Sequence, residues 1–219
     1  MTTVMTSDRA VSAVPGWHLW AWAVVVLLIG LARLGGVPLF DVDEGAFSEA
    51  TREMLASGDW GHTTLNGEPR WDKPILTYWL QALSVRTFGL GEFALRLPSV
   101  LAAWGWAVAV ALFARPRWGE VAALAAGTVV ATSLGVLAIG RAATADALLN
   151  LWLALTALDL WRHLEAEQGS PTARHALRRA GLWMGLGLLT KGPVAVLVPG
   201  AAALLFIATE PRSMWRARL

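Results

Sequence analysis

The sequence predicts an all-α integral membrane protein built as a bundle of transmembrane helices. Hydrophobic residues make up 56% of the 219 residues, and the mean hydropathy is +0.51. Both values exceed those of ordinary soluble domains. Apolar runs long enough to cross a bilayer recur along the chain, because about 18 to 20 residues suffice at the ~1.5 Å rise of a helix. The 13 Trp residues are typical of proteins that place indole rings at both membrane surfaces.

The composition also excludes several function classes. The net charge is +2 and the isoelectric point is near 9.7, but the basic residues stand in short blocks between apolar runs, so we expect no nucleic-acid partner. Cysteine is absent. This sequence can therefore form no disulfide framework, thiol nucleophile or thiolate metal site.

Five apolar stretches are candidates for transmembrane segments. The first, residues 17–34, lacks an A-x-A cleavage site, so we interpret it as a retained signal anchor. Three further spans are expected at residues 94–114, 121–139 and 145–161. The last stretch, residues 180–208, is interrupted by Lys191-Gly192-Pro193, which predicts a pair of short helices with a turn there.

Arginine-rich loops set the predicted orientation, since basic loops face the cytoplasm. They contain Arg115, Arg117, Arg162, Arg174, Arg178 and Arg179, the last three in or after a polar loop expected at residues 165–174. The segment between the first two spans then faces outward, and it carries nine acidic against four basic residues. The predicted organisation is a cytoplasmic N-terminus (1–16), a first transmembrane helix (17–35), an outer, periplasmic loop (36–93), the remaining transmembrane helices (94–208) and a cytoplasmic basic tail (209–219).

Two amphipathic juxtamembrane helices are expected in the outer loop. Apolar residues recur at helical spacing in residues 43–57, and Gly58 is suited to end that helix. Residues 74–88 carry an apolar stripe opposed by polar residues, a pattern typical of a helix that lies in the membrane interface. The stripe consists of Ile75, Leu76, Trp79, Leu80 and Leu83. Between the two helices, residues 65–68 predict a tight turn.

Three carboxylates open the first of these helices: Asp41, Asp43 and Glu44. One interpretation is structural, because Asp41 as N-cap and Glu44 three residues later imitate a capping box, and acids in a first turn complement the helix dipole. The cap does not require Asp43. The second interpretation is therefore chemical: a carboxylate at the membrane boundary that orients or deprotonates a hydroxyl group of an acceptor.

The segment Trp71-Asp72-Lys73-Pro74 also allows two interpretations. Pro74 suits the first turn of a helix, and Asp72 with Lys73 can form a solvated pair. The chain, however, contains 16 Arg and only two Lys, and both Lys73 and Lys191 precede a Pro or Gly-Pro at the expected outer face. A lysine offers a phosphate group a compact point charge.

Asp146 and Arg96 stand at the expected outer ends of spans. Asp146 either reaches the interface or lines a polar cavity, as intramembrane acids often do. Arg96 either extends to the headgroups or holds an anionic one. His62 has no second His at ligand spacing, so we expect no metal site built on it.

Taken in order, an Asp-Glu pair after the first span, "REMLASGDW", "WDKP", "LRLPS", an Asp at the start of the fourth span and "LLTKGP" resemble polyprenyl-phosphate-dependent membrane glycosyltransferases of the GT-C fold. The nearest likeness is the bacterial lipid A aminoarabinose transferase and protein O-mannosyltransferase group, over about residues 30 to 200. The resemblance implies a multi-pass protein of the bacterial inner membrane, with a cytoplasmic N-terminus, that transfers a sugar from undecaprenyl phosphate to a lipid A, protein or glycan acceptor.

The resemblance also implies roles for individual residues. Asp43 matches the catalytic carboxylate, with Glu44 as its supporting group. Lys73 is similar to the residue that stabilises the departing donor phosphate, a charge that a cation favours. Arg96, Asp146 and Lys191 are expected to line the donor or substrate cavity. Asp72 is a candidate ligand of a divalent metal ion, the one cofactor that the resemblance leaves open.

One alternative comes from another functional class. A non-enzymatic membrane transporter or lipid-binding subunit would use Asp146, Arg96 and Lys191 along a substrate path. The concentration of acids in one outer loop favours the enzyme, because a transporter tends to place its essential charges at the membrane midplane. Members of the resembled family are also longer, so we interpret this chain as a truncated one whose activity alone is in question.

Overall fold

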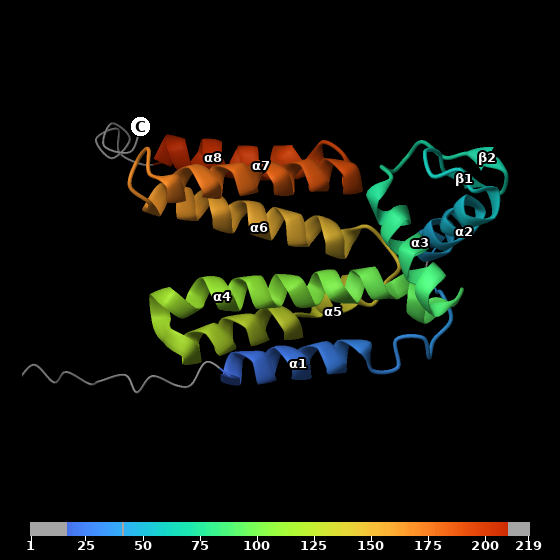
Figure 1. Cartoon of the computed structure of the whole chain (residues 1–219), viewed down its shortest axis with the longest axis horizontal. Helices are drawn as coiled ribbons and strands as arrows, with labels where there is room; N and C mark the ends of the chain where they lie inside the picture. Colours follow the sequence, from blue (N-terminus) through green and yellow to red (C-terminus); the bar gives the residue numbers. More distant parts are fainter. Residues whose placement is uncertain (1–16, 41, 210–219) are drawn as a thin grey trace, which may run out of the picture.

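The computed structural model describes residues 17–40 and 42–209, and almost all of its regular structure is helical. A bundle of long helices carries a smaller cap at one end (Figure 1). The bundle contains α1 (Trp17–Leu31), α4 (Glu92–Thr132), α5 (Leu134–Gly140), α6 (Asp146–Glu165), α7 (Pro171–Lys191) and α8 (Val194–Thr209). The cap contains α2 (Val42–Ser57), β1 (Thr64–Leu65), β2 (Glu68–Pro69) and α3 (Leu76–Phe88). The predicted cap residue Asp41, the predicted N-terminal segment 1–16 and residues 210–219 of the basic tail lie outside the described residues.

α4 consists of two helical arms joined by a sharp turn at Gly119. Gly119 has φ 82° and ψ 179° and follows Pro116 closely, so the chain reverses direction there (Figure 1). The second arm ends where Ser133 is extended, and α5 continues it. Helices therefore form over both predicted spans, but the second is broken. Among the described residues α4 is the one helix long and apolar enough to cross a membrane, and α1 and residues 194–206 are apolar but shorter. How the helices cross a membrane stays a prediction.

The predicted break near the end of the chain is confirmed. α7 ends at Lys191, Gly192 has φ 74°, and α8 begins at Val194. The expected polar loop, however, is shorter than predicted, because α7 already begins at Pro171. The Ser170 side chain accepts a hydrogen bond from the Ala173 N–H at 3.1 Å, and Pro171 suits the first turn, so these two residues start the helix early.

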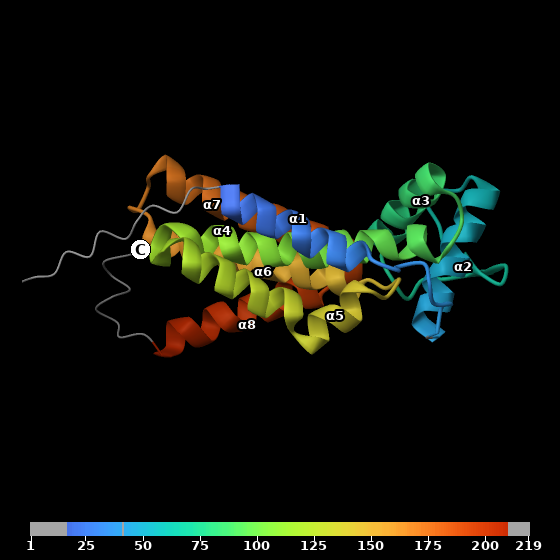
Figure 2. The same ribbon diagram turned by 90° about the horizontal axis from the view of Figure 1, so that it is seen from below.

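The arginine blocks gather at the end of the bundle opposite the cap. Arg117, next to the turn of α4, forms an ion pair with Glu165 at the end of α6. Asp159 of α6 binds both Arg162 and Arg179, each at 2.7 Å. Two views show the turn of α4 and the α6–α7 loop at one end and α2 and α3 at the other (Figures 1 and 2). The basic blocks therefore share one end, as the orientation argument requires.

The cap packs through an unexpected face of α3. Its buried residues include Thr77, Gln81 and Ser84, whereas Leu83 of the predicted apolar stripe is exposed. Gln81 turns inward because Thr51 of α2 and the Leu95 oxygen of α4 offer it hydrogen-bond partners, whereas the buried hydroxyl groups of Thr77 and Ser84 have no such partner. The apolar face of α3 is left for the expected bilayer surface. The predicted turn at residues 65–68 is confirmed as a two-residue hairpin loop, in which Asn66 and Gly67 both have positive φ.

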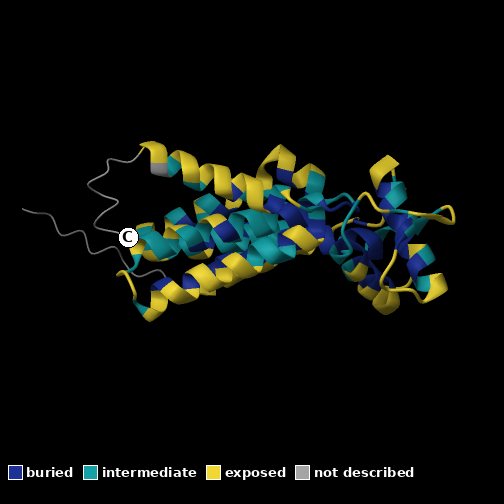
Figure 3. Cartoon of the chain, turned by 90° about the horizontal axis from the view of Figure 1, so that it is seen from above, coloured by how far each residue is buried: buried dark blue, intermediate teal, exposed yellow. Residues whose placement is uncertain are grey.

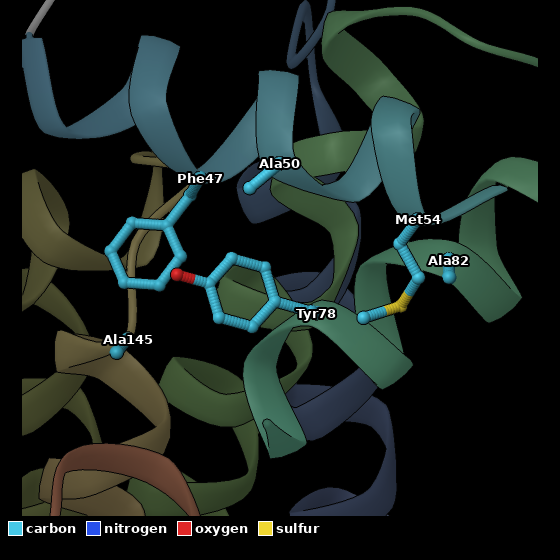
Figure 4. Packing of buried hydrophobic residues seen from close by; sticks show 6 residues of the cluster. All are labelled: Phe47, Ala50, Met54, Tyr78, Ala82 and Ala145. Carbon is cyan, nitrogen blue, oxygen red and sulfur yellow. The ribbon is translucent and has the colours of Figure 1, made fainter. Parts of the chain in front are cut away.

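An apolar cluster joins the cap to the bundle. Phe47 of α2 lies against Tyr78 of α3, with ring centroids 5.2 Å apart, and Ala145 before α6 completes the contact (Figure 4). Met54, predicted on the apolar face of the first cap helix, packs in the same cluster. Buried residues are concentrated where the cap meets the bundle (Figure 3). The cap is therefore held firmly on the bundle.

The α7–α8 hairpin predicts a sharp difference between two glycines of α7. A Cβ atom on Gly187 would lie 2.6 Å from the Cβ atom of Ala195, whereas a Cβ on Gly185 meets nothing within 4 Å. We expect Gly187→Ala to lower the free energy of unfolding by about 1–3 kcal/mol through overpacking. Gly185→Ala is the matched control and should leave it unchanged or raise it by up to about 1 kcal/mol. Thermal unfolding in detergent micelles measures both, and equal effects would contradict this packing.

Candidate active site

One member of the predicted catalytic pair, Glu44, belongs to a buried ion pair. Glu44, in the first turn of α2, is 0% exposed, and Arg96, in the first turns of α4, is 3% exposed. The two side chains face each other in a fork: Arg96 Nε donates to Glu44 Oε1 at 2.8 Å and Nη2 to Oε2 at 2.9 Å. Such bidentate charge-assisted pairs are strong and fix orientation.

Arg96 has no N–H group left for a lipid. It donates three more hydrogen bonds, to the backbone oxygens of Leu34, Val37 and Pro38. These five bonds use all five donors of a guanidinium group. The structure thus changes the expected role of Arg96: a side chain predicted to bind a headgroup or the donor phosphate instead ties α4 to the segment after α1 and to α2.

Glu44 accepts further bonds from the backbone. The Ala143 N–H donates to Oε1 at 2.7 Å and the Phe40 N–H to Oε2 at 3.2 Å. Burial by itself raises the pKa of this carboxyl, but the bonds from Arg96, Ala143 and Phe40 together outweigh burial and lower the pKa below its ordinary value. Glu44 is therefore held as a carboxylate, and its role as the supporting group of Asp43 stays a prediction.

The segment before α6 is held from a second side. Gln81 of α3 accepts a hydrogen bond from Thr51 at 2.8 Å and donates to the backbone oxygens of Leu95 and Ala143, both at 3.2 Å. Ser99 of α4 donates to the Thr144 oxygen at 3.2 Å. These bonds fix where α6 begins, and its first residue is Asp146.

Asp146 forms an ion pair with Lys191, the last residue of α7. Both side chains are about one-third exposed, so the pair lies at the surface of a hollow and is open to solvent. The structure thus joins two of the predicted site residues, 45 positions apart, in direct contact.

Lys73 and Lys191, the two lysines of the chain, line the same cavity. It has a volume of about 460 Å³ and lies where the end of α7 meets the segment that leads into α3 (Figure 1). Its charged walls are Arg70, Asp72, Lys73 and Lys191. Arg70 is paired with Asp72, and Lys191 with Asp146, so the positive excess of this region comes from Lys73. A positive excess suits an anionic ligand.

Asp43 lies at the edge of this region. It is exposed, next to the anchored Glu44, and it does not line the cavity itself. The cavity residue Arg70 lies over the ring of Phe47, which is one turn after Asp43 on α2, with Cζ 5.5 Å from the ring centroid. The turn that carries Asp43 therefore lies beside the cavity wall.

The predicted metal site does not fit the described residues. The Asp72 carboxylate is paired with Arg70, with Nε 2.8 Å from Oδ1 and Nη2 3.0 Å from Oδ2. Within residues 17–40 and 42–209, no three His, Asp or Glu side chains gather where one metal ion would bind. We therefore derive no step through a metal ion.

Sequence reasoning does not find every feature of the site. Arg70 counts among the basic residues of the outer loop, but no local pattern identifies it as a cavity cation, although the hairpin turn that sets its position is predicted. His62, considered only as a metal ligand, lies in the cavity wall. The pairing of Glu44 with Arg96 is missed as well, since two residues 52 positions apart give no local signal.

An apolar groove of about 530 Å³ adjoins the start of α3. Ile75 borders the cationic cavity and the next residue, Leu76, borders the groove. α3, α4, α6 and α7 line it with apolar side chains that include Leu80, Leu83, Leu101 and Leu151. A cationic cavity and an apolar groove thus lie on adjacent sides of one helix start.

Comparison with known proteins agrees with this arrangement. A family model described as dolichyl-phosphate-mannose-protein mannosyltransferase matches residues 72–219, more than half of the chain. The chain belongs to this family. Crystal structures of ArnT from Cupriavidus metallidurans share the fold: the apo state has a TM-score of 0.80 at 26% identity, and the state bound to undecaprenyl phosphate has 0.79 at 27%. They cover 93% and 94% of this chain, and 38% of each ArnT chain is covered. The predicted GT-C class of membrane helix bundle is confirmed.

Two relatives in the family are undecaprenyl phosphate-alpha-4-amino-4-deoxy-L-arabinose arabinosyl transferases. The protein of Edwardsiella ictaluri is 33% identical over 204 residues, which cover 91% of this chain and 36% of that protein. The protein of Aeromonas salmonicida is 34% identical over 182 residues, which cover 82% and 33%. The chain therefore spans about a third of the length of these family relatives.

The lowered pKa of Glu44 predicts a loss of stability in acid. A carboxyl whose pKa is lower in the folded state stabilises the protein above its unfolded pKa and loses that contribution as the pH falls through the folded value. We expect Glu44→Gln to lower the free energy of unfolding by about 3 kcal/mol at neutral pH, since it leaves Arg96 unpaired in the interior. Its unfolding temperature should also vary less between pH 6 and pH 3 than that of the unaltered chain.

Glu49→Gln is the matched control for this experiment. Glu49 pairs with Arg52 at 2.7 Å on the exposed side of the same helix, and exposed pairs contribute less than about 1 kcal/mol. Equal losses for Glu44→Gln and Glu49→Gln would show that the buried pair does not stabilise the site.

Proposed function

We propose that this chain carries the donor-binding half of a bacterial membrane glycosyltransferase site, at which a sugar leaves a polyprenyl phosphate and joins a lipid, protein or glycan acceptor on the outer face of the inner membrane. One observation carries the proposal: Lys73 and Lys191, from segments far apart in the sequence, line one cavity beside an apolar groove. A ligand with an anionic head and a long apolar tail matches this pair of surfaces.

The head of such a ligand suits the cationic cavity. Lysine ammonium groups are compact point charges that bind phosphate oxygens well. Lys191 is already oriented by Asp146, while Lys73 lies in the wall among the other cavity residues. Lys73 is accordingly the cation that stabilises the phosphate as it leaves, and Lys191 with Asp146 shapes the far wall.

The tail suits the apolar groove and the outer face of α3. Leu76, Leu80 and Leu83 of the predicted interfacial stripe line the groove. Burying an apolar tail there gains roughly 0.8 kcal/mol for each CH₂ group removed from water. The start of α3 then separates the head from the tail, and the phosphate remains at the membrane boundary.

Asp43 is the residue proposed to act on the acceptor. An acceptor oxygen attacks the anomeric carbon, the bond from that carbon to the phosphate oxygen breaks, and the phosphate leaves with the electron pair. For a hydroxyl acceptor, Asp43 accepts the proton as the new bond forms, whereas for a phosphate acceptor it positions the group. Glu44, anchored by Arg96, holds the first turn of α2 and so holds Asp43.

The role of Lys73 predicts a loss of lipid binding. Lys73→Met should weaken binding of undecaprenyl phosphate to the 219-residue chain by at least roughly tenfold, because a hydrogen bond to a charged group contributes about 1.5–3 kcal/mol. Microscale thermophoresis in detergent measures the affinity. Arg52→Gln, which removes a cation outside the cavity, is the control for net charge. Equal affinities of Lys73→Met and the control would contradict the proposed phosphate site.

The role of Asp43 predicts a separate effect on transfer. Asp43→Asn should leave undecaprenyl phosphate binding within about twofold and reduce sugar transfer by roughly a hundredfold or more, the range for loss of a general base. The transfer assay uses undecaprenyl phosphate 4-amino-4-deoxy-L-arabinose, the donor in the relatives' names, and lipid A, an acceptor that the resemblance implies, in a protein that contains this chain within its natural sequence. Unchanged transfer would exclude Asp43 as the base. Lipid binding without any transfer by the unaltered protein would favour a non-enzymatic lipid-binding subunit.

A further inference from the structure

One wall of the cationic cavity is aromatic. Trp71 is 75% exposed, although it lies in the wall of the cavity. The His62 ring meets it edge-on, with centroids 5.6 Å apart and planes at 85°. Both residues line the cavity that contains Lys73 and Lys191. An indole and an imidazole therefore border the space proposed for the donor head.

The hairpin holds these two rings together. The Arg70 N–H donates to the Thr63 oxygen at 2.8 Å, and the Thr63 hydroxyl donates to the Arg70 oxygen at 2.8 Å. His62 precedes Thr63 and Trp71 follows Arg70, so both lie one residue farther from the hairpin turn than these two hydrogen bonds. The register of the hairpin therefore places the two rings opposite each other.

The His62 ring is also fixed from its other side. Asp59 Oδ2 lies 3.2 Å from His62 Nδ1, and Asp59 Oδ1 accepts a hydrogen bond from the Gly61 N–H at 2.9 Å. The imidazole is thus braced between a carboxylate and the indole. The Trp71 side chain remains 75% exposed beside this contact, so indole surface is left available to a ligand.

The cavity cations leave one part of the donor head without a partner. Lysine and arginine side chains satisfy the phosphate oxygens. The C–H groups on one face of a pyranose ring need a different partner, such as the face of an aromatic ring. The electron-rich face of an indole attracts both C–H groups and an ammonium group, and it costs little conformational entropy. Trp71 is two residues from Lys73, so a sugar on the indole is next to its phosphate.

We propose that Trp71 is the sugar-binding platform of this site: the pyranose of a polyprenyl phosphate sugar stacks on the indole while its phosphate contacts Lys73. This inference rests on the proposed function, because it assigns the sugar of the same donor. His62, braced by Asp59, is the positioning residue that sets the angle of the ring.

The test compares two lipids that differ only in the sugar. The affinity of the 219-residue chain is measured for undecaprenyl phosphate and for undecaprenyl phosphate 4-amino-4-deoxy-L-arabinose, and the ratio of the two is the readout. We expect the unaltered chain to bind the sugar-linked lipid roughly tenfold more tightly, the scale of a contact between an ammonium group and an indole face. Trp71→Ala should bring the ratio to about one and leave binding of the bare lipid unchanged, while Trp71→Phe should keep most of the preference.

Trp118→Ala is the matched control. Trp118 is 66% exposed and lies at the opposite end of the bundle, beside the turn of α4. The Trp118→Ala variant should keep the same ratio of the two affinities as the unaltered chain. His62→Ala should lower the ratio partly, with no change for the bare lipid.

Each remaining outcome overturns the assignment. If Trp71→Ala weakens both lipids equally, the indole is a membrane or lipid-tail contact and not a sugar platform. If the ratio stays at its unaltered value, the sugar binds elsewhere. If the unaltered chain binds bare undecaprenyl phosphate but shows no preference for the sugar-linked lipid, the platform fails while the proposed phosphate site stands. If it binds neither lipid, the proposed function fails as well.

Discussion

The buried pair of Glu44 and Arg96 is the interaction on which the rest of the site depends. Removing two charges from water costs several kcal/mol per ion, and such a pair is tolerated only when every donor and acceptor is satisfied. Here five bonds from Arg96 and two backbone N–H bonds to Glu44 meet that condition. Because these bonds come from α2, α4, the segment after α1 and the segment before α6, one pair fixes four parts of the chain relative to one another.

The geometry of the cavity follows from that constraint. Holding Ala143 sets the start of α6 and so places Asp146. Asp146 in turn orients Lys191 at the helix break, opposite the segment with Arg70 and Lys73. On the other side of the start of α3 the apolar groove begins. The Glu44–Arg96 pair thus supports both surfaces, because the groove residues Leu97 and Pro98 directly follow Arg96.

The parts of this fold that have local signals could be predicted from the sequence. Apolar periodicity indicates the cap helices, Asn66-Gly67 indicates the hairpin turn, and Gly192-Pro193 indicates the helix break. The scarcity of lysine, together with the Pro or Gly-Pro that follows each one, singles out Lys73 and Lys191, which the fold brings to one cavity. Contacts between distant segments are beyond such reasoning. The anchoring role of Arg96, the place of Arg70 in the cavity and the burial of the polar face of α3 each depend on partners supplied by another helix, so no local pattern predicts them.

The most direct test of the central claim is an experimental structure of this chain with undecaprenyl phosphate, determined by cryo-electron microscopy in a lipid nanodisc with a rigid antibody fragment. We expect the phosphate to lie within hydrogen-bond distance of the Lys73 ammonium group, in the cavity that Lys191 also lines, with the first isoprene units along the groove of α3. A phosphate bound at the opposite, arginine-rich end, or a tail outside that groove, would contradict the proposed donor site.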